Sequence, residues 1–170
     1  SFLQVKGAKE VGIEFHSLSK TFNMTGWRIG WACGNKEMIS ALAKVKSNID
    51  SGLFQAIQIA GIHALQKPGM HLKRMIRIYQ ERLDLLVKAL QQSGWPVTAP
   101  KATFYLWASL PRGKSSQGIA TQFLQKSGIV VTPGVGFGHY GEGYIRFSFS
   151  VPTPRLKEAA KRIERLSIWP

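Results

Sequence analysis

Residues 17–30 have the sequence SLSKTFNMTGWRIG, in which one lysine and one arginine lie among hydroxyl-bearing side chains and two glycines. Hydroxyl groups, backbone amides and an arginine fork are the donors that a phosphate monoester needs. A lysine held beside them could attack an aldehyde. Each residue alone indicates little, because loop lysines are usually solvated. The chemistry depends on one loop holding all of these groups together.

Alternating apolar residues on both sides of this stretch predict two strands. The alternation covers residues 11–15 and returns over residues 27–31. We expect a strand at each place, joined by a polar loop over residues 17–26. Helical composition follows in residues 36–46 and 54–65, with serine, asparagine and glycine breakers between them. These elements alone are too few to form a sheet with both faces covered.

The remaining chain predicts an α+β unit that could close its own core. After Pro68, apolar residues at spacings of three and four predict a long helix up to about Leu90, ended by Gly94 and Pro96. Downstream we expect, in order, a strand at 103–107, a helix at 119–126, a strand at 129–132, a strand at 144–150, and a final helix with Thr153 as N-cap and Pro154 in its first turn.

The strand expected at residues 144–150 has two different faces. Side chains alternate along a strand, so one face is apolar and the other is polar. The apolar face carries Ile145, Phe147 and Phe149, and the polar face carries Tyr144, Arg146, Ser148 and Ser150. Arg146 can therefore face a binding site while the phenylalanines fill the core.

The net charge of +14 is the unusual feature of the composition. The basic residues are scattered, with the excess mostly beyond residue 66, whereas nucleic-acid binders usually cluster them on one face or arm. Such a field could also steer a substrate with carboxylates. The single cysteine, Cys33, excludes an internal disulfide, and no apolar run suits a signal peptide or a membrane span. We therefore expect a cytoplasmic protein without nucleic-acid or membrane partners.

Two further features of the sequence resemble binding sites but are interpreted otherwise. Residues 136–141 match G-x-G-x-x-G, but a dinucleotide site needs a helix to follow, and here a strand is expected. A mobile loop over an active site is the preferred interpretation. The four histidines lack metal-ligand spacing, so we expect structural roles for them and no metal site.

The string over residues 17–30 closely resembles that of class I/II aminotransferases, which use pyridoxal 5'-phosphate (PLP). The pattern is Ser-x-Ser-Lys, an aromatic residue two positions later, and then Gly-x-Arg-x-Gly, here matched without a gap by Ser17, Ser19, Lys20, Phe22, Gly26, Arg28 and Gly30. The resemblance implies that Lys20 forms the imine to the cofactor. It also implies that Ser17, Ser19 and Arg28 contribute to cofactor binding, with Ser17 and Arg28 on the phosphate.

Two other strings add to this resemblance. Residues 141–149 are similar to the family's strand whose arginine grips the substrate α-carboxylate, which implies that role for Arg146. Residues 102–107 resemble a strand whose aromatic residues line the substrate entrance. Phe104 or Tyr105 is thus a candidate wall residue, and a role in the core is equally open for each.

The resemblance implies an α/β fold: the C-terminal part of a fold type I PLP-dependent transferase. We expect residues 1–45 to end the large cofactor domain, 46–66 to form a linking helix, and 67–170 to form the α+β small domain. The chain covers less than half of a typical member, and the family's ring-stacking aromatic and the aspartate at the pyridine nitrogen belong upstream of Ser1. We therefore expect the 170 residues alone to be incomplete and inactive, and the full protein to be a homodimer.

The leading hypothesis is transfer of an amino group between an amino acid and a 2-oxo acid. Lys20 would then act as tether and as acid and base, a role that requires burial near Arg28. Residues 23–28 and 50–55 resemble most the LL-diaminopimelate and aspartate aminotransferase branch. A PLP-dependent lyase or synthase of the same fold is the alternative, and a basic binding module without catalysis is a third possibility.

Overall fold

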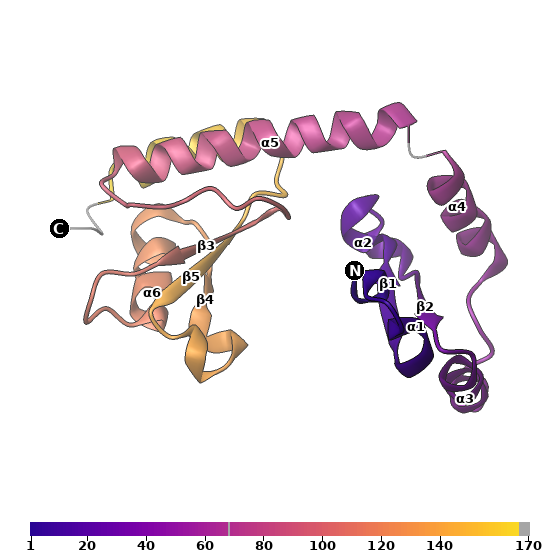
Figure 1. Cartoon of the computed structure of the whole chain (residues 1–170). Coiled ribbons are helices and arrows are strands. Elements are labelled where there is room, and N and C mark those ends of the chain that lie inside the picture. Colours follow the sequence, from indigo (N-terminus) through magenta and orange to yellow (C-terminus); the bar gives the residue numbers. More distant parts are fainter. Residues whose placement is uncertain (68, 167–170) are drawn as a thin grey trace. The chain divides into compact units, whose positions relative to one another are not determined.

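The computed structural model describes residues 1–67 and 69–166, which belong to two compact units (Figure 1). We call residues 1–72 the N-terminal unit and the chain from residue 73 onward the C-terminal unit. The fold is mixed α/β, as predicted, with helices and two antiparallel sheets.

The N-terminal unit is built around a two-stranded antiparallel sheet. Its elements, in chain order, are η1 (Phe2–Gln4), α1 (Ala8–Val11), β1 (Ile13–Ser17), α2 (Leu18–Thr21), η2 (Thr25–Trp27), β2 (Gly30–Gly34), α3 (Lys36–Ser47), α4 (Gln55–Gln66) and the start of α5 (Gly69–Gln92). The strands pair from Ile13 opposite Gly34 to Ser17 opposite Gly30. The predicted helices over 36–46 and 54–65 are confirmed.

Both predicted strands of this unit begin too early. Gly7 has a left-handed backbone conformation and precedes the short helix α1. Val11 is the last residue of that helix, so β1 begins only at Ile13. Trp27 lies in the 3₁₀ turn η2, and β2 begins at Gly30. The expected polar loop is therefore largely helical, because the Ser17 side chain caps a helical turn directly after β1.

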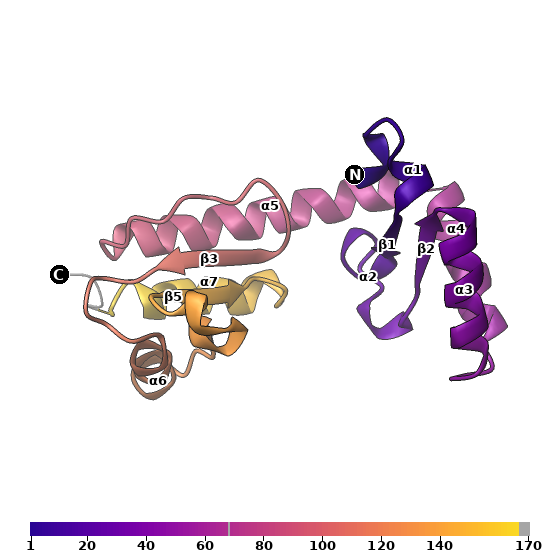
Figure 2. The ribbon, with the colours of Figure 1, turned by 60° about the horizontal axis from the view of Figure 1, so that its bottom comes forward.

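The C-terminal unit contains the rest of α5 and a three-stranded antiparallel sheet (Figure 2). Its further elements are β3 (Tyr105–Ser109), α6 (Ser116–Ser127), β4 (Thr132–Pro133), η3 (Gly134–Phe137), η4 (His139–Gly141), β5 (Tyr144–Ser148) and α7 (Thr153–Ile163). The strand order is β3-β5-β4. As predicted, Ile145, Phe147 and Phe149 are buried, and they join a core that includes leucines of α5, Trp95 and Phe123.

Several boundaries in this unit differ from the prediction; among them, β5 ends at Ser148 rather than Ser150 and α6 begins at Ser116 rather than Ile119. Thr103 has a left-handed φ of 72°, so β3 begins at Tyr105. Gly128 ends α6 in a left-handed conformation and Ile129 N–H donates to the Phe123 carbonyl, so β4 keeps only two residues. Pro152 occupies the N-cap of α7, which makes Thr153 its first helical residue and the predicted Thr153 cap wrong.

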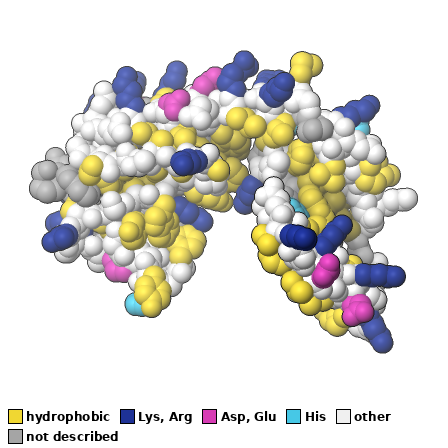
Figure 3. All heavy atoms as spheres, viewed as in Figure 1, with side chains coloured by type: hydrophobic (Ala, Val, Ile, Leu, Met, Phe, Trp, Pro, Cys, Tyr) yellow, Lys and Arg dark blue, Asp and Glu magenta, His cyan; other side chains and the backbone are white. Residues whose placement is uncertain are grey.

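Large hydrophobic side chains reach the surface of the N-terminal unit, in part within the view of Figure 3. They include residues of both strands and of the helices, namely Val11, Phe15, Trp27, Trp31, Val45, Ile49, Phe54, Ile59 and Ile62. Among the described residues, no helix combines the length and apolarity needed to cross a membrane. Within the same residues, no cluster of three metal-ligating side chains forms.

Candidate active site

The loop that carries Lys20 joins two paired strands. β1 ends at Ser17, whose Oγ accepts a hydrogen bond from Ser19 N–H at 3.1 Å and so starts the helical turn α2. Leu18 N–H donates to the Ile29 carbonyl at 3.2 Å, which closes the base of the loop. Ser17, Ser19, Lys20 and Arg28 are thereby brought into one loop, as the sequence predicts.

Apolar side chains of the loop pack in the interior of the N-terminal unit. Leu18 is 1% exposed and Met24 is also buried. Helix α4 approaches closely through Gly61, where a Cβ would lie 2.5 Å from Ile29 Cδ1 and 3.3 Å from Leu18 Cδ1. A larger residue at position 61 would require the Ile29 side chain to shift, so the glycine permits this close contact.

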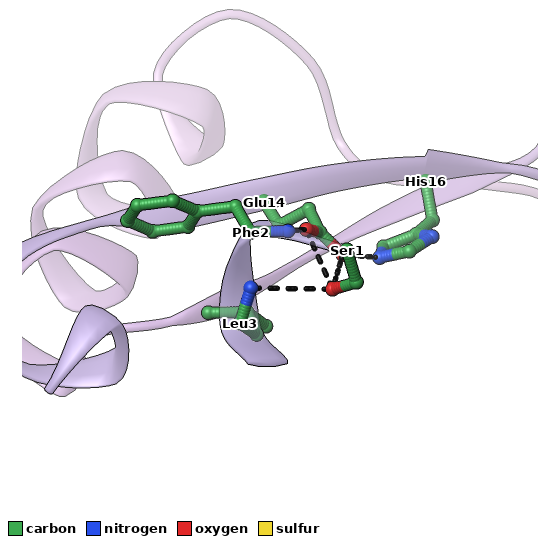
Figure 4. A network of polar contacts seen from close by, with 5 residues as sticks. All are labelled: Ser1, Phe2, Leu3, Glu14 and His16. Atoms are coloured by element: carbon green, nitrogen blue, oxygen red, sulfur yellow. Dashed lines mark hydrogen bonds and ion pairs between the residues drawn. The ribbon is translucent and has the colours of Figure 1, made fainter. Parts of the chain in front are cut away.

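A polar network ties β1 to the residues that precede it (Figure 4). The Glu14 carboxylate accepts hydrogen bonds from the Ser1 hydroxyl at 2.7 and 2.8 Å and from Phe2 N–H at 2.7 Å, and it contacts His16 Nε2. These bonds, that from Ser1 first, lower the pKa of Glu14 against the opposing effect of burial. The His16 ring stacks on Trp31 of β2, with centroids 5.0 Å apart.

Arg28 has an unusual backbone conformation. Its φ is 52°, in the left-handed region that β-carbon sterics disfavour, and Asn23 in the same loop has φ 56°. Such strain costs on the order of 1 kcal/mol per residue and persists where the surroundings enforce it, often at functional sites. The guanidinium turns back across η2, where Nη1 donates to the Thr25 carbonyl at 2.9 Å, and Thr25 Oγ1 in turn donates to the Ser19 carbonyl at 3.1 Å.

The donors of the loop suit a phosphate monoester. Ser17 Oγ accepts one bond, so its hydroxyl hydrogen is left to donate to an outside acceptor. Arg28 uses one guanidinium nitrogen within the described chain and presents other N–H groups. Lys20 is exposed at the end of α2, whereas its neighbours Leu18 and Ser19 are buried. The burial expected for Lys20 is therefore not present in this chain.

A second group of candidate residues lies on one face of the sheet in the C-terminal unit. Arg146 of β5 is paired with Trp107 of β3 and Thr132 of β4. Its Cζ lies 4.4 Å from the centre of the Tyr105 ring and 4.5 Å from that of Phe137. Its Nε is buried and has no hydrogen-bond partner among the described residues, and none of their ion pairs includes it. A guanidinium in this state can bind a carboxylate through two parallel hydrogen bonds.

The two candidate wall residues lie in different environments. Phe104 is buried in the core, and its ring stacks on Tyr79 with centroids 5.3 Å apart. Tyr105 is half-buried and lies against Arg146. Phe137 was not singled out from the sequence, although it lies in the glycine-rich segment 134–143 that precedes the arginine strand. That segment folds as the two turns η3 and η4 and, as expected, leads into a strand.

Comparison with known proteins defines the class to which this loop and this arginine strand belong. A family model of aminotransferase class I and II matches residues 3–163. The chain therefore belongs to the class I and II aminotransferases.

Relatives named LL-diaminopimelate aminotransferase and several solved structures resemble the chain. The LL-diaminopimelate aminotransferase of Moorella thermoacetica is 54% identical over 166 residues, which are 98% of this chain and 43% of the relative. The structure of an aminotransferase from Staphylococcus aureus has a TM-score of 0.88 and 36% identity, over 98% of this chain and 44% of that one. The apo-BacF structure from Bacillus subtilis has a TM-score of 0.90 and 37% identity, over 99% and 45%. The chain thus spans less than half the length of the relatives it matches.

Proposed function

We propose that this chain contributes the lysine-bearing loop and the small domain of an enzyme that transfers an amino group between an amino acid and a 2-oxo acid. The observation that carries the proposal is the single loop over residues 17–30, which presents Ser17, Lys20 and Arg28 from one pair of strands. Membership of the aminotransferase family supports it independently.

The cofactor of this proposal is pyridoxal 5'-phosphate, and the loop has the chemistry to hold it. The Ser17 hydroxyl and the Arg28 guanidinium would donate to the phosphate. Ser19 forms part of the turn between them, where its N–H donates to Ser17 Oγ and its carbonyl accepts from Thr25 Oγ1. When bound, the cofactor supplies the electron sink of the reaction. Lys20 Nζ provides the covalent tether and the base that takes the proton from the substrate Cα. Its exposure in this chain means that further protein must cover it.

Arg146 binds the α-carboxylate of the substrate in this proposal. The guanidinium is partly desolvated and lacks an ion-pair partner among the residues described, which strengthens its attraction for an anion. The net charge of +14 favours the approach of the anionic 2-oxo acid. We further propose LL-diaminopimelate as the amino donor, a diacid named in the relatives' descriptions.

The rest of the active site belongs to protein outside this chain. We propose that residues 1–45 end the large domain, that 46–66 link it to the small domain at 67–170, and that the complete enzyme is a cytoplasmic homodimer. The missing part supplies the aromatic residue that stacks on the cofactor ring and the aspartate at its nitrogen. The relatives are long enough to contain both, since this chain spans 43% of the Moorella protein.

The test is an assay of the complete protein with LL-diaminopimelate and other amino donors against 2-oxoglutarate. Formation of glutamate in step with loss of the donor, abolished by Lys20→Ala, supports the proposal. Pyruvate and ammonia from a suitable substrate would instead identify a lyase. Binding of nucleic acid with a steep salt dependence and no turnover would favour a basic binding module.

A further inference from the structure

Phe137 is an exposed aromatic residue that the core does not require. It is 52% exposed, and it lies at the end of η3 in the glycine-rich segment 134–143. Its ring contacts two residues of the sheet: Arg146, with 4.5 Å between Cζ and the ring centre, and Trp107, with 5.5 Å between ring centroids in an edge-to-face arrangement. Exposure of a phenylalanine over a guanidinium indicates a role in presenting that cation.

Within residues 1–67 and 69–166, the guanidinium of Arg146 contacts two aromatic rings, and its Nε has no hydrogen-bond partner. Both Tyr105 and Phe137 have ring centres within 4.5 Å of its Cζ. The buried Nε has no acceptor among the residues that the structure describes. An arginine without a hydrogen-bonding anchor can rotate about its side-chain torsions, so the two aromatic faces are what restrict its orientation.

A latch fixes the segment that carries Phe137. The Glu142 carboxylate accepts hydrogen bonds from Ser116 N–H at 2.6 Å and from the Ser116 hydroxyl at 2.8 Å. Ser116 Oγ also accepts from Val135 N–H at 3.3 Å, so one fully buried serine at the start of α6 ties both ends of the segment. The same ends touch each other, since a Cβ on Gly134 would lie 1.9 Å from the Gly141 carbonyl oxygen.

We propose that Phe137, held in place by the contact between Ser116 and Glu142, is a positioning residue that orients Arg146 toward the substrate carboxylate. This inference rests on the proposed function of Arg146. The latch fixes the segment, the segment places the ring, and the ring restricts the guanidinium plane. The terminal nitrogens of Arg146 are then presented to the ligand with little loss of conformational freedom on binding.

The kinetic test compares two replacements of Phe137 in the complete enzyme. Phe137→Leu keeps an apolar side chain but removes the aromatic face, and Phe137→Tyr keeps that face. We expect KM for the amino donor to rise roughly five-fold in the leucine variant, equivalent to about 1 kcal/mol, with kcat within about two-fold. The tyrosine variant should restore KM. Tyr140→Leu is the matched control, because this exposed ring of the same segment packs on His139, with 3.9 Å between ring centroids.

A second readout does not depend on catalysis. In the complete protein labelled with ¹⁵N-arginine, the Arg146 Nε–H resonance should move in Phe137→Leu and in Glu142→Gln, but not in Tyr140→Leu or Glu158→Gln. An unmoved Arg146 resonance in Phe137→Leu overturns the positioning role, whatever the activity. A moved resonance in a complete protein that transfers no amino group supports positioning and rejects the proposed function instead. Equal KM values for the leucine and tyrosine variants also contradict the proposal.

Discussion

Gly30 lies directly against the carbonyl oxygen of His16, and a Cβ at position 30 would be 2.5 Å from that oxygen. The contact occurs beside the pair of Ser17 and Gly30, where β1 and β2 meet at the base of the lysine loop. The glycine in this part of the motif is therefore required by the close approach of two backbones.

Gly30→Ala should destabilise the chain, because the atom that blocks the new methyl group is backbone and cannot turn away. We expect a loss of about 1–3 kcal/mol in the free energy of unfolding, measured by chemical denaturation. Gly26→Ala is the control from the same motif: nothing lies within 4 Å of its added Cβ. That variant should stay within about 0.5 kcal/mol of the parent. Equal losses in both variants would contradict the steric explanation.

Lys20 should carry the cofactor in the complete protein. Borohydride reduction followed by peptide mapping should find a pyridoxyl group on Lys20 Nζ, and Lys20→Ala should remove the label. Lysines elsewhere in the N-terminal unit serve as internal controls. A label on Lys36, Lys44 or Lys46 would show that the loop does not hold the aldehyde.

Arg146→Lys should be severe despite the retained charge, because an ammonium group cannot form the two parallel hydrogen bonds of a guanidinium with a carboxylate. We expect kcat/KM to fall by roughly two decades, which corresponds to about 3 kcal/mol. Cofactor absorbance should be unchanged. Arg155→Lys on α7 is the matched control in the same unit and should leave the kinetics intact. Unchanged kinetics in Arg146→Lys with several amino acids would mean that another residue binds the carboxylate.

The latch between Glu142 and Ser116 should make stability depend on acid pH. Hydrogen bonds from Ser116, first from its backbone N–H and then from its hydroxyl, hold the pKa of Glu142 below its ordinary value of 4.5. The group therefore stabilises the fold above the unfolded-state pKa, and this contribution is lost as pH falls through the lower folded-state pKa. Unfolding curves below about pH 5 should show a smaller pH slope for Glu142→Gln than for the parent.

Ser116→Ala provides the graded comparison for this pH experiment. It removes the hydroxyl bond at 2.8 Å and leaves the backbone bond at 2.6 Å. The slope should therefore fall less than in Glu142→Gln. Identical slopes in the parent and in Glu142→Gln would show that the latch does not contribute.

The 170-residue chain alone should bind the cofactor weakly and should not turn over. Lys20 is exposed and can react with an aldehyde, but the groups that orient the cofactor ring are not among the residues of this loop. Val11, Phe15, Trp27 and Trp31 are exposed on the N-terminal unit, so the chain should also self-associate. Titration with PLP measures cofactor binding, an assay with 2-oxoglutarate measures turnover, and sedimentation measures self-association. Tight stoichiometric binding with steady turnover would contradict it.

The motif over residues 17–30 could be recognised in the sequence because its chemistry is local. Hydroxyls, lysine and arginine are close along the chain, and paired strands on both sides bring them together. The alternation around Arg146 was equally informative for the core, since a period of two assigned Ile145, Phe147 and Phe149 to one buried face and Arg146 to the other face. The long helix α5 was predictable from its apolar stripe for the same reason.

Other features depend on contacts between distant residues and carry no local pattern. Whether Val11 and Trp27 continue their strands depends on turns made at Gly7 and Ser17, and alternation alone does not register those turns. The latch joins Ser116 to Glu142 across 26 positions of sequence, and Phe137 of the segment that it holds contacts Arg146 of the next strand. The sequence by itself determined the family motif and the two-faced strand of Arg146, and the roles of these residues in the chemistry stay predictions. Tertiary structure decided how Arg146 is held and why Gly30 is needed, because both follow from packing between segments that the chain order keeps apart.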